Sequence, residues 1–221
     1  MPIPKVLYQT YISYNKLPIA TRGYIRSMRR YCRGFTYEFF DDDRIEGFLS
    51  DEYGPKVLGS YRRIAIGAAK ADFFRYAILL RKGGVYLDVD SMLTGRLDEL
   101  IEPADEAIIS REGNPEFYVQ WALAYGPGHP FLAATLDKVL SNIEADRFPR
   151  DVHRMTGPSA YTEAIRECLA VKGQSIPYRE LGVDYEGYFK YKQPWARLLY
   201  LRRPNWRKVQ QERGVLHPRR A

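Results

Sequence analysis

The chain has 221 residues, of which 45% are hydrophobic and 28% charged, and it carries a net charge of +7. This composition excludes a disordered or fibrous protein, and the length favours one α/β domain with a sizeable core. Two cysteines do not make a disulfide framework, so we interpret Cys32 and Cys168 as reduced core thiols. The sequence shows neither a signal peptide nor a run of about 18 apolar residues, which favours a cytoplasmic enzyme or a soluble domain of a longer protein.

The net charge is concentrated in the C-terminal segment 196–221. Residues 1–195 contain 26 Lys and Arg against 26 Asp and Glu, whereas residues 196–221 contain eight Arg and Lys against Glu212 alone. We therefore divide the chain into a main domain, 1–195, and a basic aromatic C-terminal tail, 196–221. Such a tail suits an anionic lipid surface or the phosphates of nucleic acid, and a solvated tail or a helix packed on the domain explains it equally well. Of the two partners we expect a membrane surface, and no nucleic acid.

Taken in chain order, the hydrophobic patterns predict alternating α and β elements. A strand over residues 5–10 precedes a helix from Pro18 to about Tyr31 and a strand over 35–40. Asp41, Asp42 and Asp43 then begin a helix toward Leu49, because acidic side chains are favourable at a helix N-terminus. Later segments predict strands over 106–110 and 117–125 and helices over 130–143 and 158–169. This alternation predicts a mostly parallel or mixed sheet covered by helices.

The central helix, Ala68 to Arg81, is apolar on most of its surface, which is typical of a buried helix. Asp72 and Arg75 share one face of it by their three-residue spacing. A surface pair is the simpler interpretation of these two residues. A functional pair is favoured here, because a charge on so apolar a helix is costly to bury unless it is paired.

A Gly-Gly break and a strand follow this helix. Gly83 suits a helix C-terminus, and the apolar residues from Val85 to Val89 alternate with polar ones, ending in Asp88 and Asp90. Aspartate is disfavoured within strands, so the pair indicates a strand end that opens on a cleft, with both carboxylates on one side. Carboxylate oxygens suit Mg²⁺ or Mn²⁺, and Mg²⁺ usually combines one or two carboxylates with waters and phosphates.

This region resembles the sugar-binding DXD region of glycosyltransferase family 32 and its relatives, which include yeast initiating mannosyltransferases, capsular-polysaccharide transferases and glucosylating domains of clostridial toxins. The matching residues are Ala68, Asp72, Arg75, Gly83, Gly84, Tyr86, Leu87, Asp88 and Asp90. Weaker matches are the N-terminal Ile3–Tyr11, the Thr156-Gly157-Pro158 triplet and the segment Gly128–Phe131. The resemblance covers about residues 3–165.

The resemblance implies a single α/β domain with the GT-A nucleotide-diphospho-sugar transferase fold, a mixed central sheet flanked by helices, and a site at the strand C-termini. It implies that Asp88 and Asp90 hold Mn²⁺ or Mg²⁺ against the diphosphate of a UDP- or GDP-sugar, with Asp72, Arg75 and Asp90 as the catalytic residues. The implied substrate-binding residues are Gln9, Thr10, Tyr11, Asp72, Arg75, Tyr86, Asp88, His153, Thr156 and Gly157. The implied reaction is hexose transfer, with retention, to a glycan or lipid-linked acceptor in polysaccharide biosynthesis.

One departure from the family concerns the late His or Ser-Trp that often completes its site. This chain has Tyr185 to Trp195 there, with no histidine, so His153, Asp184, His217 and water all stay open as the third metal ligand. If the reaction inverts configuration, an Asp or Glu between residues 105 and 116 is the first candidate for the base.

Two other functions also fit parts of the sequence. The run from Val85 to Met92 resembles the strand and D-x-D of haloacid-dehalogenase-like phosphatases, although those enzymes usually carry Thr or Val where Met92 stands and place the motif near the N-terminus. A non-catalytic nucleic-acid-binding module would depend on the basic tail alone. Tyr185, Tyr188 and Tyr191 occur at helical spacing and fit either an acceptor groove or core packing, of which packing is the commoner cause.

Overall fold

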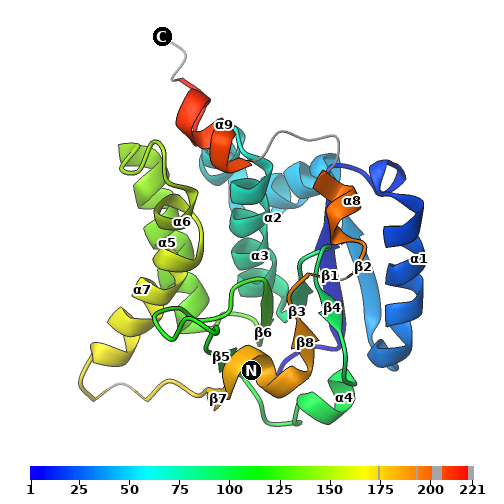
Figure 1. Cartoon of the computed structure of the whole chain (residues 1–221). Helices are drawn as coiled ribbons and strands as arrows, with labels where there is room; N and C mark the ends of the chain where they lie inside the picture. Colours follow the sequence, from blue (N-terminus) through cyan, green and yellow to red (C-terminus); the bar gives the residue numbers. More distant parts are fainter. Residues whose placement is uncertain (174, 193, 201–205, 219–221) are drawn as a thin grey trace.

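The computed structural model describes residues 1–173, 175–192, 194–200 and 206–218. Its centre is a six-stranded sheet in the order β2-β1-β3-β6-β5-β7 (Figure 1). The strands are β1 (Val6–Thr10), β2 (Thr36–Phe40), β3 (Gly84–Leu87), β5 (Ala107–Ser110), β6 (Ala122–Tyr125) and β7 (Arg179–Leu181). Only β6 runs antiparallel to its neighbours among these strands, so the predicted mixed sheet is confirmed. A second sheet pairs β4 (Met92–Leu93) with β8 (Phe189–Lys190).

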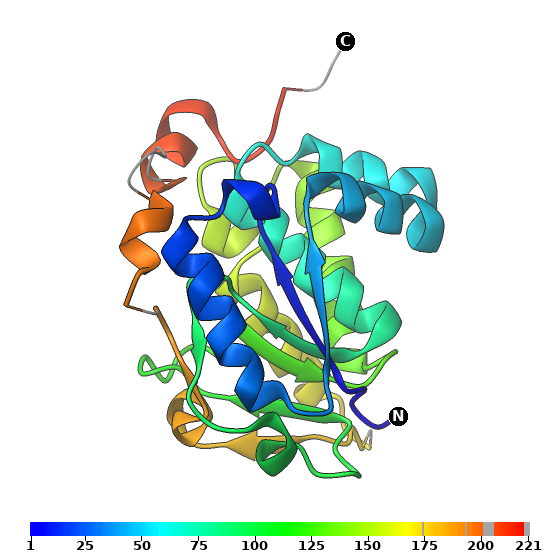
Figure 2. The same cartoon turned by 90° about the vertical axis from the view of Figure 1, so that its right-hand side faces the viewer.

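Helices cover both faces of the sheet (Figures 1 and 2). One face packs under α2 (Asp42–Arg63), α3 (Gly67–Lys82), α5 (Pro130–Ala145), α6 (Val152–Met155) and α7 (Pro158–Ala170). The other lies under α1 (Ile19–Met28), the 3-10 helices η2 (Arg29–Cys32) and η3 (Val183–Gly187), and α4 (Leu97–Leu100). A further 3-10 turn, η1 (Tyr14–Lys16), leads into α1. Strand alternation explains the two cores, because Tyr8 and Tyr86 face α3 while Leu7 and Val85 face α1.

Most predicted elements are present, and the departures have local causes. The side chain of Asp41 accepts a hydrogen bond from the amide of Arg44, so the acidic triplet caps a helix as expected. That helix continues to Arg63 rather than ending near Leu49, through a break at Gly54 (φ 76°). The predicted strand 117–125 shortens to β6, because residues 117–121 make only an isolated bridge with Arg111.

The described parts of the C-terminal segment pack against the domain. Leu199 of α8 (Ala196–Tyr200) packs with Leu17 and Ile25, and Trp206 at the start of α9 (Trp206–Arg213) contacts the large core beside α3. Val215 is fully buried and pairs through its backbone with Ala65. Residues 201–205 and 219–221 of the predicted tail lie outside the described residues. None of the described helices is both long and apolar enough to cross a membrane.

Candidate active site

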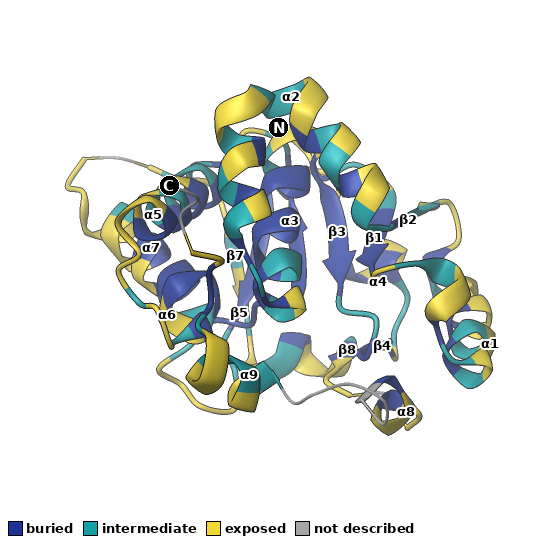
Figure 3. Cartoon of the chain, turned by 90° about the horizontal axis from the view of Figure 1, so that it is seen from above, coloured by how far each residue is buried: buried dark blue, intermediate teal, exposed yellow. Residues whose placement is uncertain are grey.

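The face of α3 that carries the charged residues Asp72 and Arg75 is buried. Asp72 is 6% exposed and Arg75 is 3% exposed, so the simple surface pair suggested by their spacing is wrong. The guanidinium of Arg75 lies 3.2 Å from the carboxylate of Asp72 and also donates to the backbone oxygen of Gln120 at 2.7 Å. Figure 3 shows why such pairing is needed: α3 is mostly buried, lying over the sheet among the other helices.

Asp88 and Asp90 follow β3 in a turn, rather than continuing the strand as the alternation predicted. The turn is closed by a hydrogen bond from the amide of Ser91 to the carbonyl of Asp88, 2.9 Å long. The amide of Asp88 donates to the carbonyl of Trp121, which fastens the turn to the chain entering β6. The reason for the departure is that the ladder between β3 and β6 ends at Leu87, leaving the following residues free to turn. The carboxylates therefore owe their proximity to a turn, and not to strand periodicity.

Two donors converge on one oxygen of Asp88. Nη2 of Arg75 donates to Oδ1 at 2.9 Å, and the hydroxyl of Tyr86 donates to the same oxygen at 2.8 Å. The guanidinium of Arg75 also lies over the ring of Tyr86, 4.7 Å from its centroid. The side-chain amide of Gln9 donates to the backbone oxygen of Asp88 at 3.3 Å. One carboxylate oxygen is thus fixed by α3 and β3, which orients the side chain.

Asp72 is the centre of a second, fully buried network. Its Oδ1 accepts from the side-chain amide of Gln120 at 2.8 Å, and its Oδ2 accepts from the hydroxyl of Thr156 at 2.9 Å. The same amide of Gln120 donates to the hydroxyl of Tyr76, which in turn donates to the backbone oxygen of Thr156 at 3.0 Å. The network joins α3, the chain before β6 and the chain before α7, so side chains separated by up to 84 residues act as one unit.

The charges in this region are strongly interacting. Burial raises the pKa of Asp88 to about 7, an effect that Arg75 opposes and the neighbouring Asp90 reinforces. Burial acts to lower the pKa of Arg75, but the charges of Asp88 and Asp72 outweigh it and leave that pKa above its ordinary value. Burial also raises the pKa of Tyr86, so its hydroxyl stays protonated and donates to Asp88.

The carboxylate pair fits a divalent cation that is shared with a ligand. Tyr86 and Arg75 both donate to Oδ1 of Asp88, so Oδ2 is the oxygen that could coordinate a cation together with Asp90. The side chain of Asp90 is buried, at 6% exposed. In the described part of the chain no three His, Cys, Asp or Glu side chains gather into a metal cluster. Two carboxylates without a protein cage match the way Mg²⁺ is bound together with substrate phosphates and water.

The structure brings only some of the predicted substrate residues to this turn. Gln9 donates to the backbone oxygen of Asp88 and accepts a hydrogen bond from the hydroxyl of Tyr37. The hydroxyl of Thr10 instead donates to the backbone carbonyl of Phe40. Tyr11 is half-buried beside the cluster of Leu17, Ile25 and Leu199.

The other predicted residues lie on the α6–α7 side. Thr156 binds Asp72, as described above. Gly157 is the N-cap residue of α7, and a Cβ at this position would stand 3.0 Å from the backbone of His153. His153 itself is exposed and stacks on Trp206, 5.8 Å away. Its predicted contact with substrate stays a prediction.

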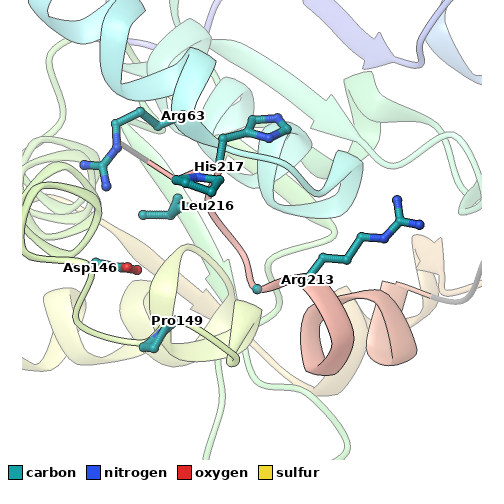
Figure 4. A pocket seen from close by; sticks show the side chains of 8 residues that line it. Arg63, Asp146, Pro149, Arg213, Leu216 and His217 are labelled. Atoms are coloured by element: carbon teal, nitrogen blue, oxygen red, sulfur yellow. The ribbon is translucent and has the colours of Figure 1, made fainter. Parts of the chain in front are cut away.

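The third metal ligand stays a prediction, and its two remaining protein candidates have different surroundings. His217 lines a hollow together with Arg63, Asp146, Pro149 and Arg213, and Asp88 and Asp90 are not among its lining residues (Figure 4). Asp184 begins three consecutive left-handed residues in η3, and burial raises the pKa of its carboxyl.

Two residues near the turn, Gln120 and Trp121, were missed from the sequence, whereas Tyr191 had been considered for an acceptor groove. Gln120 connects Asp72 and Arg75, and the ring of Trp121 lies 5.6 Å from that of Tyr191. Burial raises the pKa of Tyr191 to about 12, with further contributions from Asp90 and Asp88, which places this side chain beside the two carboxylates. A glutamine inside the otherwise apolar run from Tyr118 to Tyr125 was the available signal for the first of them.

The range suggested for a base, Asp105–Glu116, contains four acids, of which two form ion pairs. Asp105 pairs with Arg179, and Glu106 pairs with the N-terminal amine. Glu112 is half-buried, and burial and then Asp184 raise the pKa of its carboxyl. Its charge also acts on Tyr191, whose pKa is affected by Asp88 and Asp90 as well, so Glu112 is the acid of this range that we take as the candidate base.

This mixed sheet, with an aspartate pair in the turn after an inner strand, defines a GT-A type nucleotide-diphospho-sugar transferase fold. Residues 18–106 match the family described as the glycosyltransferase sugar-binding region containing a DXD motif. The solved structure of PaToxG glycosyltransferase superposes with a TM-score of 0.65 at 17% identity, covering 76% of this chain and 70% of that one. The predicted resemblance and fold are therefore confirmed, and the match favours a transferase over a phosphatase.

Several curated glycosyltransferases are similar in sequence to this chain. An uncharacterized glycosyltransferase of Acanthamoeba polyphaga mimivirus is 39% identical over 100 residues, which are 45% of this chain and 40% of that protein. An initiation-specific alpha-1,6-mannosyltransferase of Schizosaccharomyces pombe is 26% identical over 76% of this chain and 49% of its own length. Inositol phosphoceramide mannosyltransferase 3 of the same yeast is 30% identical over 59% of this chain and 35% of that protein. The chain thus spans about half or less of the length of these relatives.

Proposed function

We propose that this chain is a metal-dependent hexosyltransferase that takes its sugar from a UDP- or GDP-linked donor. The observation that carries the proposal is the convergence of Arg75 and Tyr86 on Asp88, with Asp90 in the same turn. Buried ion pairs add little to stability, because each charge costs several kcal/mol to bury and pairing only offsets that cost. A buried group of interacting charges is therefore better explained by a ligand that it serves. Mannose is the first sugar to test, because two of the relatives described above are named mannosyltransferases.

In the proposed reaction each residue of the site has a stated task. Asp88 and Asp90 hold Mn²⁺ or Mg²⁺, which when bound stabilises the negative charge that develops on the departing diphosphate. Asp72 and Arg75 bind hydroxyls of the donor sugar, and Arg75 adds positive charge near the reaction centre. The network of Gln120 and Thr156 keeps Asp72 in place. With retention of configuration the departing phosphate accepts the proton of the acceptor hydroxyl, so no carboxylate base is required.

We also propose that the acceptor is a glycan or a lipid-linked molecule and that the protein works in the cytoplasm, with membrane-surface contact through residues 196–221. The name of the inositol phosphoceramide relative supports a lipid acceptor. The basic and aromatic side chains of this segment, such as Arg197 and Trp206, support contact with anionic lipid.

A donor panel tests the proposed function directly. The full chain is incubated with UDP- and GDP-hexoses and Mn²⁺, and release of the nucleoside diphosphate is measured with and without chelator. The proposal expects release from one nucleotide class, and expects that donor to raise the melting temperature, because a ligand bound by the native state alone stabilises it. Phosphate release from simple monoesters in place of donor turnover would assign the turn to phosphatase chemistry instead.

A further inference from the structure

The N-terminal part of the chain carries a charge that the even balance of residues 1–195 conceals. Residues 1–37 contain seven Lys and Arg and no Asp or Glu. Five of them lie on or directly after α1 and η2, three or four residues apart or adjacent: Arg22, Arg26, Arg29, Arg30 and Arg33. This spacing places them along one side of the helical segment. We call this set the basic face.

The basic face is exposed, and its charge is not neutralised by neighbours. All but the half-buried Arg22 are exposed, and none of the five forms an ion pair with a described residue. The acidic side chains on the elements packed against this segment have other partners, since Asp98 and Glu99 of α4 pair with Arg96 and Glu38 of β2 pairs with Arg44. Thr21, Ile25, Met28 and Cys32, on the adjacent stripe, are buried against the sheet, so the arginines face outward. Figure 2 shows α1, in blue, lying on the outer side of the sheet.

Apolar groups border the same surface. Ile19, the first residue of α1, is 80% exposed. Leu199 of α8 packs with Leu17 and Ile25, which brings Leu198, 37% exposed, and Arg197 to the edge of the basic face. Figures 1 and 3 show α1 and α8 at the periphery of the molecule, on the side of the sheet away from α5 and α7.

We propose that the basic face docks on an anionic lipid bilayer and that this contact holds the site at the membrane surface. Charge complementarity supports it, because clustered arginines bind the headgroups of anionic lipids. The exposed Ile19 favours lipid over nucleic acid, since an apolar side chain finds partners among acyl chains and none along a phosphate backbone. Val89, in the carboxylate turn, packs on the same cluster as Ile25 and Leu199, so a bilayer docked on α1 would lie near the turn of Asp88 and Asp90.

The experiment compares charge-matched variants of the full chain. The basic-face variant carries Arg26→Gln, Arg29→Gln, Arg30→Gln and Arg33→Gln. The control removes the same charge from exposed positions over the opposite side of the sheet with Lys56→Gln, Arg147→Gln, Arg150→Gln and Lys172→Gln. A third variant, Arg197→Gln with Arg207→Gln and Lys208→Gln, probes the C-terminal segment. Circular dichroism checks that each variant is folded.

Each protein is sedimented with phosphatidylcholine vesicles with and without phosphatidylserine. The native chain and the control are expected to bind the anionic vesicles in a salt-sensitive way. The basic-face variant should partition roughly several hundredfold more weakly, because each of the four Arg near an anionic surface contributes roughly fivefold. Equal binding of the basic-face and control variants, loss in the third variant alone, or no binding by the native chain would overturn the proposal. Tighter binding of the native chain to a DNA or RNA oligonucleotide at the same salt would also overturn it.

Discussion

Nη2 of Arg75 lies 2.9 Å from Oδ1 of Asp88, so a buried helix holds the carboxylate of the turn through one charged hydrogen bond. Arg75 is 3% exposed and is charged at any physiological pH. Breaking such a buried pair by removing one partner costs about 3–5 kcal/mol.

Asp90→Ala is expected to abolish transfer and the metal-dependent part of donor binding, because it removes one of the two carboxylates that we propose hold the cation. Donor affinity is measured by calorimetry with and without Mn²⁺, and turnover by nucleotide release. Asp137→Ala, which removes an exposed carboxylate from α5, is the matched control and should behave as the native chain does. Full turnover by Asp90→Ala in the presence of chelator would rule out the assignment.

Thr156→Val is expected to weaken donor binding about tenfold or more. The valine keeps the shape of the side chain but leaves Oδ2 of Asp72 without its donor, and an unsatisfied buried group costs roughly 1–3 kcal/mol. Thr135→Val is the control, since Thr135 is equally buried but donates only to a carbonyl of its own helix. If both variants lose the same melting temperature and the same donor affinity, Thr156 has a structural role alone.

Gly83→Ala is expected to destabilise the protein by about 2 kcal/mol or more, because residue 83 has a positive φ and strained backbones cost of this order. An added Cβ would also stand 2.7 Å from the rings of Pro127 and Pro4. Gly59→Ala on α2 is the control, since its Cβ would meet nothing within 4 Å and should stabilise by about 0.4–1 kcal/mol. Urea unfolding measures both, and a native-like midpoint for Gly83→Ala would contradict the packing at this turn.

Glu112→Gln tests the stereochemical course. With retention we expect activity within about tenfold of the native chain, because general-base catalysis, which contributes roughly 10²–10⁴-fold where it operates, is not used. The anomeric configuration of the product is read by NMR on the same samples. An inverted product together with a loss of several hundredfold would make Glu112 the base.

The sequence predicted the scaffold of the site better than its connections. Helix periodicity placed Asp72 and Arg75 on one face, and the order of elements predicted the mixed sheet. What it could not supply was the partner of each charge. Gln120 binds Asp72, from which it is 48 residues away in the sequence. The turn at Asp88 is held to Trp121 by a backbone hydrogen bond, which any residue type could make and which the sequence therefore does not reveal.

The charge pattern shows a similar limit. Counting over residues 1–195 averaged the arginines of α1 with acids on distant elements, so the basic face was not apparent until the helices were placed. A shorter counting window, from Met1 to Tyr37, would have revealed it.

The antiparallel course of β6 has a consequence for how this scaffold could diversify. Because β6 enters the sheet beside the end of β3, residues 113–116 form the exposed tip of a hairpin whose arms are held at Ser110 and Gln120. Insertions or replacements at this tip would leave the turn of Asp88 and Asp90 unmoved while changing the surface next to it. Under the proposed function, changes at this hairpin tip could alter the acceptor preference while the donor site stays the same.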